Sequence, residues 1–127
     1  MSETLYLTRG VRSGPDDAIS EEEMIQSGEL TKYSEAIPEN STDLLVAATI
    51  DISQLKAVFI MVDQDMILET NDGSTPDDTF TLKANVPLIW SVDDPLPNPF
   101  SEDITALYLT NTTAGTFTAR FLEDPTV

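Results

Sequence analysis

Hydrophobic and polar residues alternate with a period close to two along most of the chain from residue 30 onward. This alternation is typical of strands with one buried face, and Asn, Asp, Gly, Ser or Pro bounds each segment. The strands predicted in this way are Leu30–Ile37, Leu44–Ile50, Leu55–Val62, Met66–Thr70, Thr79–Ala84, Pro87–Val92, Ile104–Thr110 and Thr116–Leu122. The pattern therefore predicts an all-β fold of about eight strands, an antiparallel β-sandwich or a jelly-roll-like domain.

Short polar connections predict two hairpins within this set. Residues 63–65, Asp-Gln-Asp, suggest that Leu55–Val62 pairs with Met66–Thr70. Residues 111–115, Asn-Thr-Thr-Ala-Gly, suggest the same for the last two strands, with the glycine in a left-handed or otherwise special conformation. At the other end, Pro38 ends the first strand, because proline has no amide donor for a β-ladder.

The first 29 residues have a different pattern and predict an N-terminal arm before a sandwich domain at residues 30–127. A strand-like piece at Thr4–Thr8 and a Gly-Pro-Asp-Asp loop precede Ser20 and Glu23, which are spaced as a helix capping box. One short turn of helix is expected there, ended by Gly28. The arm either completes a sheet or lies across a neighbouring subunit, and a frayed tail is the alternative.

Charge and composition exclude several functions. The chain has 23 acidic and 6 basic residues, a net charge of −17, so nucleic acid and anionic membrane surfaces are not expected partners. The charge favours solubility over a dedicated site for cations or a basic partner. With no histidine and no cysteine, the chain cannot build a Ser-His-Asp triad, a thiolate nucleophile or a histidine metal site. The N-terminus lacks a signal-peptide pattern, which predicts synthesis in the cytoplasm.

The abundant carboxylates leave two chemical alternatives. Acidic residues gather in two loops, Asp72, Asp77 and Asp78 in one and Asp93, Asp94, Glu102 and Asp103 in the other. Calcium binds carboxylate and carbonyl oxygens, but neither loop has EF-hand spacing, and acids that cap turns are the favoured interpretation. A pair of carboxylates for glycoside hydrolysis is the remaining enzymatic alternative.

Three aromatic residues, Trp90, Phe100 and Tyr108, are candidates for a sugar-binding platform. Trp90 alternates with Leu88 along a predicted strand, a position that favours the core over a ligand surface.

Several short segments resemble small virion proteins of tailed bacteriophages. They are Lys32-Tyr33-Ser34-Glu35-Ala36-Ile37-Pro38, the strand pair at 55–70 ending in Glu69-Thr70-Asn71, Pro87-Leu88-Ile89-Trp90, Asn98-Pro99-Phe100 and Ile104-Thr105-Ala106-Leu107-Tyr108-Leu109-Thr110-Asn111. In size and character the chain is most similar to capsid decoration or cement proteins, which are small, β-rich, cysteine-poor and acidic. No catalytic, cofactor-binding or metal-binding residue is transferred by this resemblance.

The resemblance implies a non-enzymatic protein on the outer surface of the phage head, a homo-oligomer, with a trimer favoured. Its partners would be the major capsid protein or other virion proteins, and its role would be to stabilise the assembled shell. The alternatives are a carbohydrate- or calcium-binding β-sandwich module of the tail or receptor-binding apparatus, and a head-tail connector or tail protein.

Overall fold

The computed structural model describes residues 3–12 and 18–126, with side chains from Gly28 onward. Within those ranges the chain forms nine strands and one short 3-10 helix, η1 (Ile52–Gln54). The strands are β1 (Glu3–Arg12), β2 (Ala18–Ile37), β3 (Leu44–Ile50), β4 (Leu55–Val62), β5 (Met66–Thr70), β6 (Thr79–Leu82), β7 (Leu88–Ser91), β8 (Ile104–Asn111) and β9 (Gly115–Glu123). The predicted all-β fold is confirmed, and each of the eight predicted strands has a counterpart among β2 to β9.

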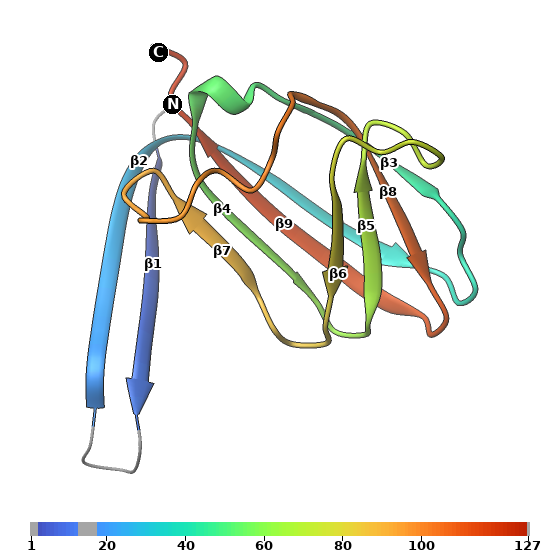
Figure 1. The fold of residues 1–127 in the computed structure, drawn as a ribbon, viewed down its shortest axis with the longest axis horizontal. Coiled ribbons are helices and arrows are strands. Elements are labelled where there is room, and N and C mark those ends of the chain that lie inside the picture. Colours follow the sequence, from blue (N-terminus) through green and yellow to red (C-terminus); the bar gives the residue numbers. More distant parts are fainter. Residues whose placement is uncertain (1–2, 13–17, 127) are drawn as a thin grey trace.

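The strands form two antiparallel sheets packed face to face (Figure 1). One sheet has the order β1-β2-β9-β4-β7 and the other β3-β8-β5-β6. Apart from the hairpin connections β1–β2 and β5–β6, consecutive strands lie in opposite sheets, so the chain crosses repeatedly between the layers. Eight strands, β2 to β9, wound in this way into two four-stranded layers form a jelly roll.

The core lies between the two layers. Alternate residues of each strand face it, as in β4, where Val58, Ile60 and Val62 are buried, and in β9, where Phe117 and Phe121 are buried. The period of two predicted from the sequence therefore marks the inward face of each strand.

The N-terminal arm is a β-hairpin, and the predicted helix after Ser20 is wrong. Residues 18–28 of β2 pair antiparallel with β1, while residues 29–37 pair with β9. The strand is thus continuous across the predicted boundary at residue 30 and begins at Ala18. A capping-box pattern is a weak local preference, and antiparallel pairing with β1, with one irregularity between Val11 and Arg12, is what this segment forms instead. The predicted Gly-Pro-Asp-Asp loop lies outside the described residues.

The two predicted hairpins within the sandwich are also wrong. β4 pairs with β7 and β9, whereas β5 pairs with β6 and β8. β8 pairs with β3 and β5, and β9 pairs with β2 and β4. The short connections at 63–65 and 112–114 pass from one sheet to the other. Gly115 is not in the left-handed region, and a Cβ there would lie 2.7 Å from a side-chain oxygen of Asp63, which would have to move.

The described part of the chain holds no apolar helix of the length needed to cross a bilayer.

Candidate interaction surfaces

The first predicted acidic group fastens the loop between β5 and β6. Asp72 Oδ1 accepts hydrogen bonds from the backbone amides of Ser74 (2.7 Å) and Thr75 (3.3 Å). These bonds hold the pKa of Asp72 below its ordinary value, because they stabilise the carboxylate. Asp77 accepts from Asn71 Nδ2 at 2.7 Å, and Asp78 accepts from the Ser101 amide at 2.8 Å. Asp72 therefore caps a local turn, as the favoured interpretation expected, whereas Asp77 bonds to the side chain of Asn71 and Asp78 connects this loop to the loop before β8.

The second predicted acidic group is distributed over separate contacts. Asp103 Oδ1 accepts from the amide of Ile52 at the start of η1 (3.0 Å), and Asp94 Oδ1 accepts from the amide of Leu96 (3.3 Å). Among the residues whose side chains are described, no group of three or more acids is arranged to hold a metal ion.

Asn71 is the residue that the sequence reasoning missed in these loops. It has a φ of 70°, a left-handed conformation that asparagine tolerates better than most residues. Its Oδ1 accepts from the amide of Thr105 (2.7 Å), and its Nδ2 donates to the carbonyl of Asp103 (2.7 Å). Asn71 therefore ties the loop after β5 to the start of β8.

The three aromatic residues do not form a binding platform. Trp90 lies in the core, as favoured, and its Nε1 donates to the carbonyl of Leu96 at 2.9 Å. Phe100 is buried too, in edge contact with Phe80 at 5.2 Å between ring centroids. Tyr108 is half-buried on β8, between the inward-facing residues 107 and 109, and so faces out of the opposite sheet.

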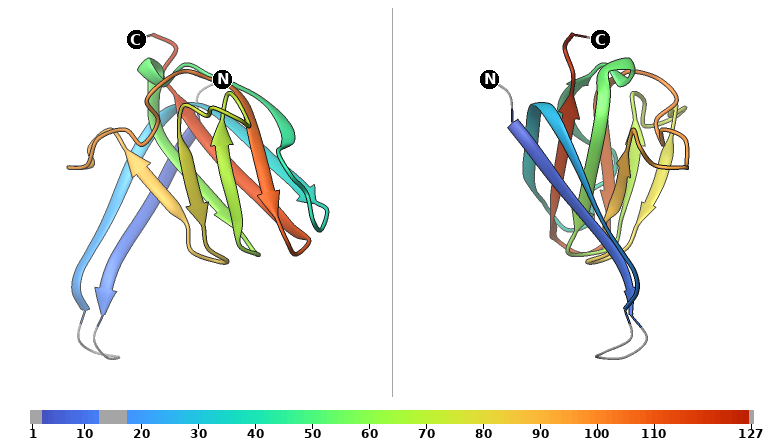
Figure 2. Two further views of the ribbon diagram at one scale, coloured as in Figure 1. Left: turned by 45° about the vertical axis from the view of Figure 1, so that its right-hand side comes forward. Right: turned by 90° about the vertical axis from the view of Figure 1, so that its left-hand side faces the viewer.

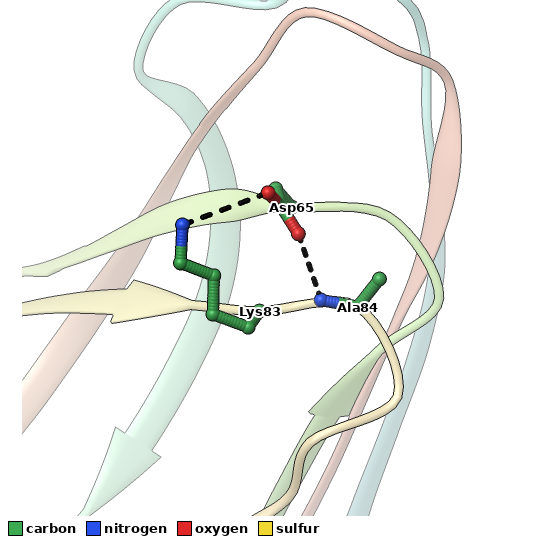
Figure 3. A network of polar contacts seen from close by, with 3 residues as sticks. All are labelled: Asp65, Lys83 and Ala84. Carbon is green, nitrogen blue, oxygen red and sulfur yellow. Dashed lines mark hydrogen bonds and ion pairs between the residues drawn. The ribbon is translucent and has the colours of Figure 1, made fainter.

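An exposed acid joins the two ends of the β5–β6 hairpin (Figure 3). Asp65 accepts from the backbone amide of Ala84 at 2.9 Å and lies 3.7 Å from the ammonium group of Lys83. Both charged side chains are 65% exposed, so the ion pair contributes little to stability. Lys83 is thereby occupied within its own hairpin.

One carboxyl pair is brought together that the sequence did not predict. Glu69, on β5, shares a hydrogen bond with Asp43, which precedes β3. Desolvation of Glu69, this bond and the nearby charges of Asp43 and Asp72 raise the pKa of Glu69 above its ordinary value. The pair lies on an open sheet face, without an enclosing cleft lined by both residues among the described pockets.

The outer face of the four-stranded sheet presents apolar and hydroxyl side chains. Leu45 on β3 is 57% exposed and Ile67 on β5 is 40% exposed, while Tyr108 on β8 lies opposite Leu45 in the register. Threonines 79 and 81 on β6 continue the same face. Leu45 and Ile67 are separated by β8, so this face combines single exposed apolar side chains with Tyr108 and threonine hydroxyl groups.

The outer face of the five-stranded sheet has a different character. The register places Lys32, Arg120, Phe59 and Ile89 in one row across β2, β9, β4 and β7. We call these four residues the cationic row. The neighbouring row, Leu30, Leu122 and Ala57, forms a small hydrophobic cluster together with Phe59 and Ile89.

No carboxylate occupies the strand positions that share this face from residue 30 onward. These positions are Leu30, Lys32, Ser34, Ala36, Ala57, Phe59, Met61, Ile89, Ser91, Thr116, Thr118, Arg120 and Leu122. In a chain of 23 acids and 6 bases, these strand positions present two cations and no carboxylate to an acidic partner.

The hairpin leaves the sandwich beside this face. Gly28 marks the point, because a Cβ there would collide with the carbonyl oxygen of Glu123 and lie 3.5 Å from Leu122 Cγ. The β2 backbone thus passes directly against the end of β9. On the N-terminal side of Gly28, the hairpin of β1 and β2 projects past the sandwich. Its far end lies well away from the other strands (Figure 2).

Protein-family models, curated proteins and solved structures were compared with the chain, and none of them matches it. The surfaces of the molecule therefore supply the basis for a function.

Proposed function

We propose that this protein is a non-enzymatic structural component of a tailed-bacteriophage particle, a capsid decoration protein that binds the assembled shell and stabilises it. The observation that carries the proposal is the projecting hairpin. β1 pairs only with β2, and residues 18–28 of β2 pair only with β1. An isolated two-stranded ribbon is marginally stable in water, so an element of this kind suits a protein that works when docked on others.

The sandwich supports the same role because the residues from Gly28 onward build a closed two-layer core between themselves. Among the residues whose side chains are described, the buried core residues lie at Ile37 or beyond, and Tyr33 and Leu44 pack against them. A body with a core of this kind can present an extension to its neighbours without losing its own fold.

The outer face of the four-stranded sheet is the surface we assign to the shell. Leu45 and Ile67 supply exposed apolar area there, and the surrounding threonines supply hydroxyl groups for hydrogen bonds. Desolvation and the neighbouring Asp43 raise the pKa of Glu69 above its ordinary value, which makes this acid easier to neutralise on contact. Jelly rolls are common in virus particles, an analogy of fold that adds to the likeness of sequence segments.

The test is co-sedimentation of the purified protein with undecorated phage heads. We expect the full chain to bind heads, and Leu45→Glu to weaken binding about tenfold or more, because a charge would be buried at the contact. Leu96→Glu is the matched control: Leu96 is a leucine of the loop after β7, 67% exposed compared with 57% for Leu45, and it is outside the assigned face. Binding by neither the full chain nor the control would refute the proposal.

A variant that begins at Gly28 separates fold from function. It should remain folded, with a Tm within about 5 °C of the full chain, because it keeps every buried residue of the described core. It should no longer protect heads against heat or denaturant. Protection equal to that of the full chain would contradict the role given to the hairpin.

A further inference from the structure

We propose that the cationic row on the five-stranded sheet binds the projecting hairpin of a second copy of this chain. The inference rests on the proposed assembly role of the hairpin, but it concerns contacts between copies and does not require the shell. It names what the hairpin docks on, and which charges match.

The acceptor surface is built around two neighbouring cations. Lys32 on β2 and Arg120 on β9 are Cα partners in the register, so they stand side by side. Neither side chain forms an ion pair or hydrogen bond with the residues whose side chains are described, whereas Lys83 is paired with Asp65. Two adjacent cations without an acid are a notable arrangement in a chain of net charge −17, and they attract carboxylates.

Apolar side chains complete the acceptor surface. Arg120 has Phe59 as its partner on β4, and Phe59 has Ile89 as its partner on β7; all three are half-buried. A ribbon lying on this row would cover the Phe59 ring, the Ile89 side chain and the aliphatic stems of the two cations while its acids meet the charged heads. Charge at one side and apolar area at the other also fix the orientation of the docked segment.

The hairpin supplies the matching acids. Residues 21–23 of β2 are three consecutive glutamates. Glu22 has Arg9 as its Cα partner on β1, so it has a cation opposite, whereas Glu21 and Glu23 have Gly10 and Thr8 as partners. Positions 21 and 23 are on one face of the ribbon, about 7 Å apart along the strand. The Cα atoms of paired residues such as Lys32 and Arg120 are about 5 Å apart, a difference that their long side chains accommodate.

The occupant is a second copy because the hairpin of the same copy points elsewhere. β2 leaves the sheet at Gly28, and residues 18–23 belong to the part of the hairpin far from the sandwich (Figure 2). A contact between the arm of one copy and the sheet of the next is heterologous, and such contacts close into rings when the rotation between copies permits. The trimer favoured for a decoration protein is one such ring.

The test is the oligomeric state of the full chain in solution, without heads, measured by sedimentation velocity. The wild-type chain should form an oligomer that weakens as salt is raised, because exposed charges are screened. Lys32→Glu with Arg120→Glu should weaken self-association by about tenfold or more, as expected when close charge pairs across an interface are lost. Glu21→Lys with Glu23→Lys should do the same, and it leaves Glu22 and its register partner Arg9 unchanged.

Combining all four substitutions should restore the oligomer, because the charges are then exchanged between the two surfaces. Lys83→Glu is the matched control for Arg120→Glu and should leave the oligomer unchanged. Lys32→Gln with Arg120→Gln removes the charges more gently if the reversed variant fails to fold. A monomeric wild-type chain, an oligomer that survives the reversal of folded variants, or a failure of the exchange to restore it would overturn the inference.

The failure of this inference can be told apart from that of the proposed function. If the wild-type chain is monomeric and the reversal of Lys32 and Arg120 abolishes binding to heads, the row binds an acidic segment of the shell and the second-copy inference is wrong. If the charge exchange restores the oligomer but heads are not bound, the inference stands and the decoration role falls.

Discussion

The sandwich and the hairpin share one strand but are stabilised in different ways. In the sandwich, β2 is paired with β9 and packs Ile37 and Tyr33 against a core that spans both sheets. In the hairpin, the same strand has one neighbour, β1, and no third strand or second layer. The sandwich holds its shape through burial of apolar area, whereas the described part of the hairpin is a two-stranded ladder, an arrangement that is marginally stable by itself in water. The comparison predicts that substitutions in the two regions have separable effects.

The largest effect is expected in the core of the sandwich. Phe121 is fully buried, with its ring 6.0 Å from those of Tyr33 and Phe100. Phe121→Ala should lower the free energy of unfolding by about 3–5 kcal/mol, because it removes a large apolar side chain and leaves a cavity. Urea unfolding followed by the fluorescence of Trp90 measures this. A loss below about 1 kcal/mol would show that the core is less closely packed than described.

The second-largest loss of stability is expected from a substitution at the junction between the sandwich and the hairpin. A Cβ at Gly28 would meet the backbone carbonyl of Glu123, so Gly28→Ala must shift β2 or β9 and should cost about 1–3 kcal/mol. It should also redirect the hairpin and weaken any oligomer. At Gly73 an added Cβ meets the side chain of Asp43, which can move, so Gly73→Ala is the milder control. Equal thermal stability of both variants would contradict the close passage of β2 over β9.

The side-chain amide of Asn111, at the end of β8, bonds to the β2–β3 and β8–β9 connections. Its removal should lower stability by a similar amount. Asn111 Oδ1 accepts from the amide of Ser41 (3.0 Å), and its Nδ2 donates to the carbonyl of Thr113 (2.9 Å). Asn111→Ala would leave these groups without their partner at a cost of about 1–3 kcal/mol. Thr112→Ala, at an exposed neighbouring position, should be close to neutral in the same thermal unfolding measurement. A neutral Asn111→Ala would mean that water replaces the amide.

The smallest effect is a pH dependence on the outer face of the four-stranded sheet. The pKa of Glu69 is raised in the folded state, so the folded chain holds this proton more tightly than the unfolded chain. Stability should therefore decrease as pH rises from the ordinary glutamate pKa through the raised one. Glu69→Gln should remove that part of the decrease, whereas Glu39→Gln, in the exposed β2–β3 connection, serves as the control. If the stability of Glu69→Gln and of wild type depended on pH in the same way, the interaction of Glu69 with Asp43 would be refuted.

The strands could be predicted from the sequence because apolar and polar residues alternate within each strand, and this alternation marks the buried face. Val58, Ile60 and Val62 alternate with less buried positions in β4, and no other part of the chain is needed to see it. Pairing is not local. The connection at 63–65 is short enough for a hairpin, yet β4 and β5 lie in different sheets, because a sandwich needs the chain to cover both sides of its core.

The candidate surfaces were beyond prediction for the same reason. Lys32 and Arg120 are far apart in the sequence, and only the β2–β9 register makes them neighbours. Asn71 and Asn111 have the residue type of turns in the sequence, whereas their side chains bridge distant segments. In the arm, the helical signals of Ser20 and Glu23 were weaker than the ladder formed with β1.

The most direct test of the decoration role is electron cryomicroscopy of undecorated phage heads mixed with the full-length protein. The account predicts regular density at the local threefold positions of the shell. In it the four-stranded sheet should face the shell, and each hairpin should reach the five-stranded sheet of the next copy. Heads that carry no ordered added density, although the protein is folded and in excess, would contradict the claim that this chain is a capsid decoration protein.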